Sequence, residues 1–180
     1  LVSLLYMPAE LLGEEHPDSL GTPEISLITC SPGADIYELC GHTALRVKLP
    51  PMDLAVNYGT FDFNAPNFVY RFVKGETDYM VTAYPFRYFI EEYRRTGRSI
   101  TEQPLNLSPD EAWKLLAMLQ TNTLPENRTY RYNYVKDNCS TRPLSMIEKA
   151  IGDTIALDAP AGYDSLTSVS YTHLTLPTKL

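Results

Sequence analysis

Residues 25–49 read ISLITCSPGADIYELCGHTALRVKL, and this stretch decides the fold class. Apolar residues alternate with small or polar residues over 25–30 and again over 43–49, which is the pattern of half-buried β-strands. A turn signal, Ser31-Pro32-Gly33, ends the first run, and Pro50-Pro51 stops the second. The stretch therefore predicts two strands with a connection between them.

The remainder of the chain predicts further strands and then helices that alternate with extended segments. Strands or extended segments are predicted over residues 54–63, 77–83, 99–107 and 130–135, and residues 68–73 are ambiguous between strand and helix. Helices are predicted from Phe86 to a C-cap at Gly97, from the capping box Ser108-Pro109-Asp110-Glu111 to a point before Pro125, and from residues 138–140 to a stop at Gly152. Gly59 marks a bulge or a close approach within its strand. This order of elements predicts an α+β fold.

Three tyrosines lie on one face of the strand that is predicted over residues 130–135, at positions 130, 132 and 134. A tyrosine face packed against a helix is the favoured interpretation, and the floor of an apolar groove is the alternative. Either way, the end of this strand leads the chain directly to Cys139.

The composition restricts the class of protein. With 180 residues, 44% of them apolar, the chain is long enough for one domain with a sizeable core. The formal net charge of −7 argues against nucleic-acid binding, which normally uses a basic face. Because there is no run of about 18 apolar residues, no membrane-spanning helix is predicted.

Both ends of the chain are set apart from the domain expected at residues 25–152. Residues 1–24 are interpreted as a disordered leader or as the remnant of a signal peptide, since residues 1–9 are mostly apolar and a basic start is missing. Residues 153–168 are expected to begin a truncated C-terminal region. Residues 169–180 resemble a translated sequencing adapter, and they are excluded from the fold as an artefact.

One histidine and one cysteine are the candidates for nucleophilic catalysis. Of the three histidines, His16 lies in the leader and His173 in the excluded tail, which leaves His42 in the domain. Cys139 lies where a helix is predicted to begin, and free N–H groups there stabilise a thiolate and can hold an oxyanion. A thiol and an imidazole are the minimum for thiolate acyl chemistry, and a structural role for each is the alternative. We predict that the two side chains lie within about 3 to 5 Å of each other.

A third group is expected to orient the imidazole. Asn57 and Asp62 are the candidates on the strand that follows His42. Asn57 is favoured because it lies in the middle of the strand, where its side chain can face a histidine on a neighbouring strand.

A metal site is the alternative use of these residues. Cys40 and His42 share one face of a strand, and with Cys30 and Cys139 they make up a Cys₃His set. The spacing lacks the short paired knuckles of structural zinc sites, which argues against zinc. A Cys30–Cys40 disulfide also stays open, and with three cysteines at least one thiol is left outside any intramolecular bond.

Six runs, taken together and in order, identify a resemblance. They are Thr29-Cys30-Ser31-Pro32-Gly33, Gly41-His42-Thr43-Ala44-Leu45-Arg46-Val47, Asn57-Tyr58-Gly59-Thr60-Phe61-Asp62-Phe63, Gly97-Arg98-Ser99, Tyr130-Arg131-Tyr132-Asn133 and Asp137-Asn138-Cys139-Ser140-Thr141-Arg142-Pro143. Over residues 25–152 the chain resembles the Lnb N-terminal periplasmic domain family, which is typical of Bacteroidetes-like bacteria. The resemblance implies a permuted papain-like (NlpC-type) antiparallel sheet packed against helices, in which the histidine strand precedes the cysteine helix.

The resemblance also implies an activity in the cell envelope. The implied reaction is N-acylation of bacterial lipoproteins through a thioester on Cys139, with His42 as its catalytic partner. Asn57 matches a position of a family motif, and its catalytic role is inferred from its place on the strand. A phospholipid would donate the acyl group and a lipoprotein amine would accept it, with no metal or organic cofactor. The expected location is the periplasm, with an inner-membrane anchor in a missing C-terminal region. A cell-wall amidase or peptidase, a lipid hydrolase and a non-catalytic envelope binding module are the alternatives. Cys40 departs from the family pattern, where a bulky apolar residue is expected.

Overall fold

The computed structural model describes residues 21–35, 38–61, 70, 71, 74, 78–133 and 136–155. The elements, in chain order, are β1 (Glu24–Cys30), β2 (His42–Leu49), β3 (Met52–Phe61), β4 (Asp78–Pro85), α2 (Phe86–Arg95), β5 (Ile100–Pro104), α3 (Pro109–Thr123), β6 (Thr129–Arg131) and α4 (Thr141–Ile151). The interpretations of residues 1–20 and 156–180 as leader and tail lie outside the described residues. Asp62 and most of the ambiguous segment 68–73 also lie outside them.

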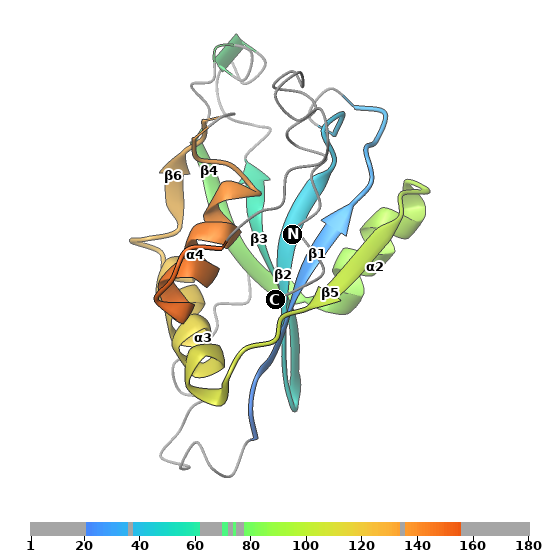
Figure 1. The fold of residues 1–180 in the computed structure, drawn as a ribbon. Helices are drawn as coiled ribbons and strands as arrows, with labels where there is room; N and C mark the ends of the chain where they lie inside the picture. Colours follow the sequence, from blue (N-terminus) through green and yellow to red (C-terminus); the bar gives the residue numbers. More distant parts are fainter. Residues whose placement is uncertain are drawn as a thin grey trace, which may run out of the picture.

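The described strands form one antiparallel sheet in the order β5-β1-β2-β3-β4-β6 (Figure 1). The first four strands along the chain lie side by side, and β5 and β6 return to pair with the two outer ones. The connection between β2 and β3, residues 50 and 51, is short and favours antiparallel pairing of these two strands. The predicted α+β class is confirmed, because helices pack on an antiparallel sheet.

Helices cover both faces of this sheet (Figure 1). On one face α3 and α4 pack against Leu45 and Val47, and on the other α2 packs against Ala44 and Ala55. Side chains alternate between the faces of a strand, so the residues of β2 enter the two cores in turn. His42 precedes Ala44 by two residues, and it therefore begins on the α2 side of the sheet.

The predicted helix ends are confirmed where local side chains determine them. At the start of α3, the Ser108 hydroxyl accepts the Glu111 N–H at 3.4 Å, and the Glu111 carboxylate accepts the Ser108 N–H at 2.8 Å. This reciprocal pair is the capping box expected from the sequence. At the end of α4, Gly152 has a φ of +74°, the left-handed conformation that closes a helix and that glycine adopts without steric cost.

The tyrosine strand is shorter than predicted. β6 ends at Arg131, and the chain then turns because Asn133 Oδ1 accepts the Lys136 N–H at 2.9 Å. An asparagine side chain that bonds nearby backbone competes with a strand ladder, so the strand prediction is wrong for the described residues beyond Arg131. Tyr130 is buried as expected of a packed face, whereas Tyr132 leaves the strand.

Candidate active site

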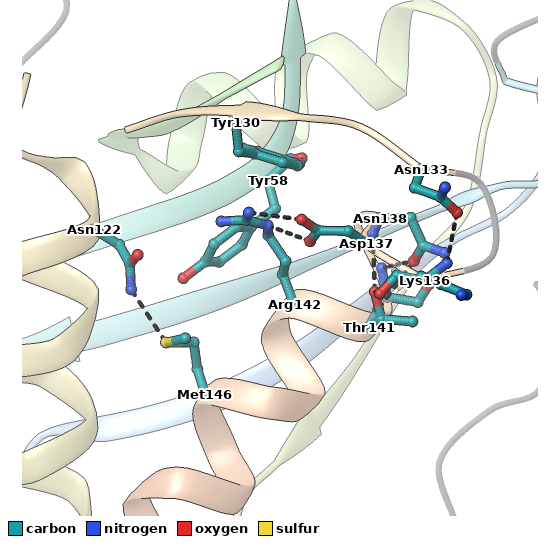
Figure 2. Close-up of polar contacts among 11 residues, drawn as sticks. Tyr58, Asn122, Tyr130, Asn133, Lys136, Asp137, Asn138, Thr141, Arg142 and Met146 are labelled. Atoms are coloured by element: carbon teal, nitrogen blue, oxygen red, sulfur yellow. Dashed lines mark hydrogen bonds and ion pairs between the residues drawn. The ribbon is translucent and has the colours of Figure 1, made fainter. Parts of the chain in front are cut away.

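Cys139 lies in the turn that leads into α4. The Asn138 side chain holds this turn, because its Oδ1 accepts the N–H groups of Ser140 and Thr141 at 2.8 and 3.0 Å. In return, the Asn138 N–H donates to the Thr141 hydroxyl at 2.8 Å (Figure 2). An Asx turn of this kind orders the backbone just before a helix. The predicted helix start at residues 138–140 is confirmed, and it places Cys139 at the helix entrance.

The turn before Cys139 is braced from the other side by Arg142. Its guanidinium forms a two-point ion pair with Asp137, of which the Nη2–Oδ2 contact is 2.8 Å, and it lies 3.6 Å from the centre of the Tyr130 ring (Figure 2). The Tyr130 hydroxyl in turn donates to the Tyr58 carbonyl oxygen. Such a planar two-point pair fixes orientation, so the Cys139 turn is tied to β6 and, through Tyr130, to β3.

His42 is the first residue of β2, and Asn57 fixes its ring. The His42 Nε2 lies 2.8 Å from Asn57 Oδ1, which also accepts the Gly59 N–H at 2.8 Å. The Asn57 amide group donates to the Tyr84 hydroxyl at 3.4 Å. His42 is also hydrogen-bonded to Cys139. Because Nε2 is engaged by Asn57, Nδ1 is the ring nitrogen left for the sulfur.

Gly59 makes room for the imidazole. The register of β3 against β4 shifts between Asn57 and Thr60, so the bulge expected at Gly59 is confirmed. The close approach is present as well, because a Cβ atom at Gly59 would overlap His42 Cε1 and stand 3.1 Å from Nδ1. A side chain at this position would push the ring out of its place against Asn57 and Cys139.

The two reacting groups shift each other's pKa toward an ion pair. Burial alone would raise the pKa of the Cys139 thiol, but the His42 charge and hydrogen bond, with further bonds from the Thr43 N–H and the Tyr132 hydroxyl, lower it to about 7. Burial alone would lower the pKa of His42, and the Cys139 thiolate outweighs this effect and raises it. A thiolate beside an imidazolium near neutral pH is the resting state of an activated thiol nucleophile.

The donors that face the sulfur differ from those expected. The N–H groups of Ser140 and Thr141 are occupied by Asn138, so these two helix-start groups are not available to an oxyanion. The Thr43 N–H and the Tyr132 hydroxyl donate to the sulfur instead. Thr43 also joins the histidine strand to the cysteine helix, because its hydroxyl lies 3.1 Å from that of Ser140.

Tyr132 is the residue that sequence reasoning missed as part of the site. Its ring stacks on Tyr79 with centroids 4.0 Å apart and an interplanar angle of 21°. Burial and then the Cys139 charge raise its pKa, so its hydroxyl stays protonated and donates. The tyrosine pattern of residues 130–134 suggested packing. Only the position of Tyr132 in a run that resembles a family motif indicated that this residue belongs to the site.

The other cysteines lie apart from this chemistry. Cys30, Cys40 and Cys139 are all free thiols, and burial raises the pKa of Cys30 to about 12. Within the described residues, no group of three or more His, Cys, Asp and Glu side chains is arranged to hold a metal ion. The structure thus assembles neither the disulfide nor the zinc set weighed above.

A first prediction follows for the reactivity of the thiols. A small alkylating agent should label Cys139 with a rate that rises through about pH 7, because half of the groups are thiolate where the pH equals the pKa. Cys30, which is 2% exposed and has a raised pKa, should react far more slowly, and Cys40 should be slower than Cys139. His42→Ala should slow labelling of Cys139 at pH 7, because the thiolate loses its cationic partner.

The measurement is the labelling rate of each cysteine by peptide mass spectrometry between pH 5 and 10. Equal rates for the three thiols, unchanged by the histidine substitution, would mean that the Cys139–His42 contact does not activate the sulfur.

The comparison with known families agrees with the expectation from the motifs. The profile of the Lnb N-terminal periplasmic domain family matches residues 17–170. No curated protein and no solved structure matches the chain. No helix of the described part is long and apolar enough to cross a membrane.

Proposed function

Since the chain belongs to the Lnb N-terminal periplasmic domain family, we propose that it is a thiol acyltransferase of the cell envelope that N-acylates bacterial lipoproteins. The observation that carries this proposal is the contact of His42 with both Asn57 and Cys139, which combines an oriented base with a thiol of lowered pKa. This constellation suits acyl transfer through a thioester, because the thiolate is a good nucleophile and a good leaving group. A permuted papain-like fold for the domain is part of the same proposal.

In the first step the Cys139 thiolate attacks the carbonyl carbon of an acyl ester in a phospholipid. A C–S bond forms, and the carbonyl oxygen becomes an oxyanion. The oxyanion then collapses, the ester C–O bond breaks, and the His42 imidazolium gives its proton to the departing alcohol oxygen. The products are a thioester on Cys139, a lysolipid and a neutral imidazole.

In the second step an amine replaces the sulfur. The nitrogen of the lipoprotein α-amino group attacks the thioester carbonyl, a C–N bond forms, and His42 Nδ1 takes a proton from the nitrogen. The C–S bond breaks, and sulfur leaves as the thiolate. The imidazolium–thiolate pair is thereby restored, and the acyl group is carried by an amide.

Tyr132 has a specific part in this proposal. Asn138 occupies the N–H groups of Ser140 and Thr141, whereas the Tyr132 hydroxyl and the Thr43 N–H donate to the sulfur. Donors positioned where negative charge develops stabilise a tetrahedral intermediate. We therefore assign oxyanion stabilisation to Tyr132 and Thr43.

A second prediction tests this assignment. Tyr132→Phe should lower acyl transfer by about 10²-fold, the effect of removing one oxyanion donor. It should leave alkylation of Cys139 at pH 9 nearly unchanged, because alkylation passes through no oxyanion. Tyr79→Phe, which keeps the ring that stacks on Tyr132, is the control and should retain transfer. If Tyr132→Phe slows both reactions equally, the hydroxyl serves the thiolate and not the oxyanion.

The proposed function is tested by mass spectrometry of a lipoprotein N-terminus. The full-length protein is expressed in a bacterial host that lacks lipoprotein N-acyltransferase, and the N-terminal lipopeptide is analysed. An added amide-linked acyl chain on the α-amine is the expected result. A free amine together with released fatty acid would identify a lipid hydrolase, and a free amine with trimmed muropeptides would identify a cell-wall peptidase or amidase. Either result would overturn the proposal.

A further inference from the structure

A contact between two hydroxyl groups lies directly beside the two reacting residues. Thr43 follows His42 on β2, and Ser140 follows Cys139 in the turn that leads into α4. The Thr43 Oγ1 and Ser140 Oγ atoms are 3.1 Å apart, and the contact is partly buried. The hydroxyl pair and the His42–Cys139 pair therefore join the same two segments at adjacent positions, and each spans 97 positions of sequence.

The hydroxyl contact adds a directional constraint to the packing of α4 on β2. Apolar side chains of α4, among them Ile147, share a core cluster with Leu45 of β2. Hydrophobic contact is non-directional, so it holds a helix on a sheet without setting its exact position along the strand. A hydrogen bond is short and directional, and it sets the distance between its two atoms. The Thr43–Ser140 contact supplies this constraint at the end of α4 that lies next to Cys139.

The backbone N–H groups of the same two residues have other partners. The Ser140 N–H donates to Asn138 Oδ1 at 2.8 Å, and the Thr43 N–H donates to the Cys139 sulfur. A substitution that removes only a hydroxyl group leaves both of these donors in the chain. The role of the hydroxyl pair can therefore be tested apart from the turn and from the donor to the sulfur.

We propose that the Thr43–Ser140 hydroxyl contact holds His42 and Cys139 within hydrogen-bonding distance of each other, so that both hydroxyl-bearing side chains act as positioning residues for the thiol nucleophile. This inference rests on the proposed function, because it names the contact that keeps its nucleophile beside its base. Neither hydroxyl group makes or breaks a covalent bond in either step. When the distance between sulfur and imidazole grows, the ion pair weakens, and the pKa of the thiol rises toward its ordinary value.

The titratable groups around the sulfur make this distance measurable. Among the described residues, those that interact electrostatically with Cys139 are His42 on β2, Cys30 on β1, Tyr130 on β6 and Tyr132 just after it. Burial raises the pKa of Cys30 and of both tyrosines, so these groups stay uncharged near neutral pH. The charge that favours the thiolate at pH 7 comes from His42. The pH at which Cys139 becomes reactive therefore reports its contact with His42.

The first measurement is the pH profile of Cys139 alkylation in the full-length protein, with a wild-type midpoint expected at about pH 7. Thr43→Val keeps the shape of threonine without its hydroxyl, and Ser140→Ala removes the other hydroxyl. Each should raise the midpoint by about one pH unit, which lowers the thiolate fraction at pH 7 about fivefold. Thr43→Ser restores a hydroxyl and should return the midpoint toward the wild-type value. The double variant should shift no further than the single variants, because all of them remove the same contact.

The second measurement is acylation of Cys139 by p-nitrophenyl octanoate at pH 7, which the burst of p-nitrophenol reports. Thr43→Val and Ser140→Ala should each slow the burst and leave its amplitude unchanged, since every Cys139 is still present and reacts more slowly.

Thr123→Val is the matched control. Thr123 is the last residue of α3, and its half-buried hydroxyl donates to the Gln120 carbonyl oxygen at 2.8 Å. Valine there also removes a hydroxyl hydrogen bond, but from a helix that does not carry a reacting residue. A general effect of losing such a bond should appear in the unfolding temperature of this variant, and the alkylation midpoint and the burst should stay at their wild-type values.

Wild-type midpoints in both Thr43→Val and Ser140→Ala would overturn this inference. A shift in only one of them, or shifts that add in the double variant, would also overturn it, because contact between the two hydroxyl groups would then not be the cause. Absence of a burst in wild-type protein whose midpoint lies near pH 7 would instead remove the proposed function. The pH profiles would still decide whether the hydroxyl pair positions His42 and Cys139.

Discussion

Cys139→Ser and His42→Ala are each expected to abolish the proposed N-acylation of lipoproteins, with losses of at least about 10³-fold, the scale expected when a nucleophile or its base is removed. A serine hydroxyl in place of the thiol does not ionise near pH 7, so the thioester cannot form. Without His42, the sulfur loses the charge that lowers its pKa, and the attacking amine loses its proton acceptor. The measurement is the fraction of N-acylated lipopeptide in the host that lacks this activity.

Cys40→Ser is the matched control for the cysteine substitution. Cys40 is a free thiol with no role in the proposed mechanism, so its replacement should leave the acylated fraction unchanged. Thermal unfolding of all three variants should resemble that of the wild type, since none of the substitutions opens a large apolar cavity. Persistent acylation in folded Cys139→Ser protein would exclude a thioester on this residue.

Gly59→Ala is expected to have the next largest effect, on the order of 10²-fold in acyl transfer, because small displacements of a catalytic group have costs of this size. The new methyl group would occupy the space of His42 Cε1 and move the ring away from Asn57 and Cys139. The thiol should lose its imidazolium partner, and its alkylation at pH 7 should slow as it does in His42→Ala. Alkylation rates and acyl transfer, measured on the same preparation, check both expectations.

Gly97→Ala separates this local effect from a general loss of stability. Gly97 has a φ of +67°, so an alanine there is strained, but its Cβ would meet no atom within 4 Å. This control should lower the unfolding temperature and leave the reactivity of Cys139 intact. If Gly59→Ala keeps the wild-type alkylation rate, the ring tolerates the methyl group, and the space above Gly59 does not hold the base in place.

The sequence by itself determined the elements of this domain and the position of its two reactive residues. Alternation predicted β1 and β2, the Ser108 capping box predicted the start of α3, and the sequence predicted a helix that begins at residues 138–140. These features depend on residues within a few positions of one another, so local sequence patterns are sufficient to predict them. The choice of His42 needed only the exclusion of the other two histidines.

The tertiary structure decided what surrounds the sulfur. His42 and Cys139 are separated along the chain by 139 − 42 = 97 positions, and a strand register, a bulge at Gly59 and the turn held by Asn138 bring them together. The sequence predicted free N–H groups at this helix start, but it could not show that the Asn138 side chain accepts two of them, those of Ser140 and Thr141.

Sequence reasoning did not find one partner of the site, Tyr132. It comes from a segment whose local pattern, a tyrosine alternation, is explained by packing. Its relation to Cys139 arises only because β6 ends early, at Arg131. Local patterns record which face of an element is buried, whereas the groups that meet at a reacting atom are selected by the packing of elements that are distant in sequence.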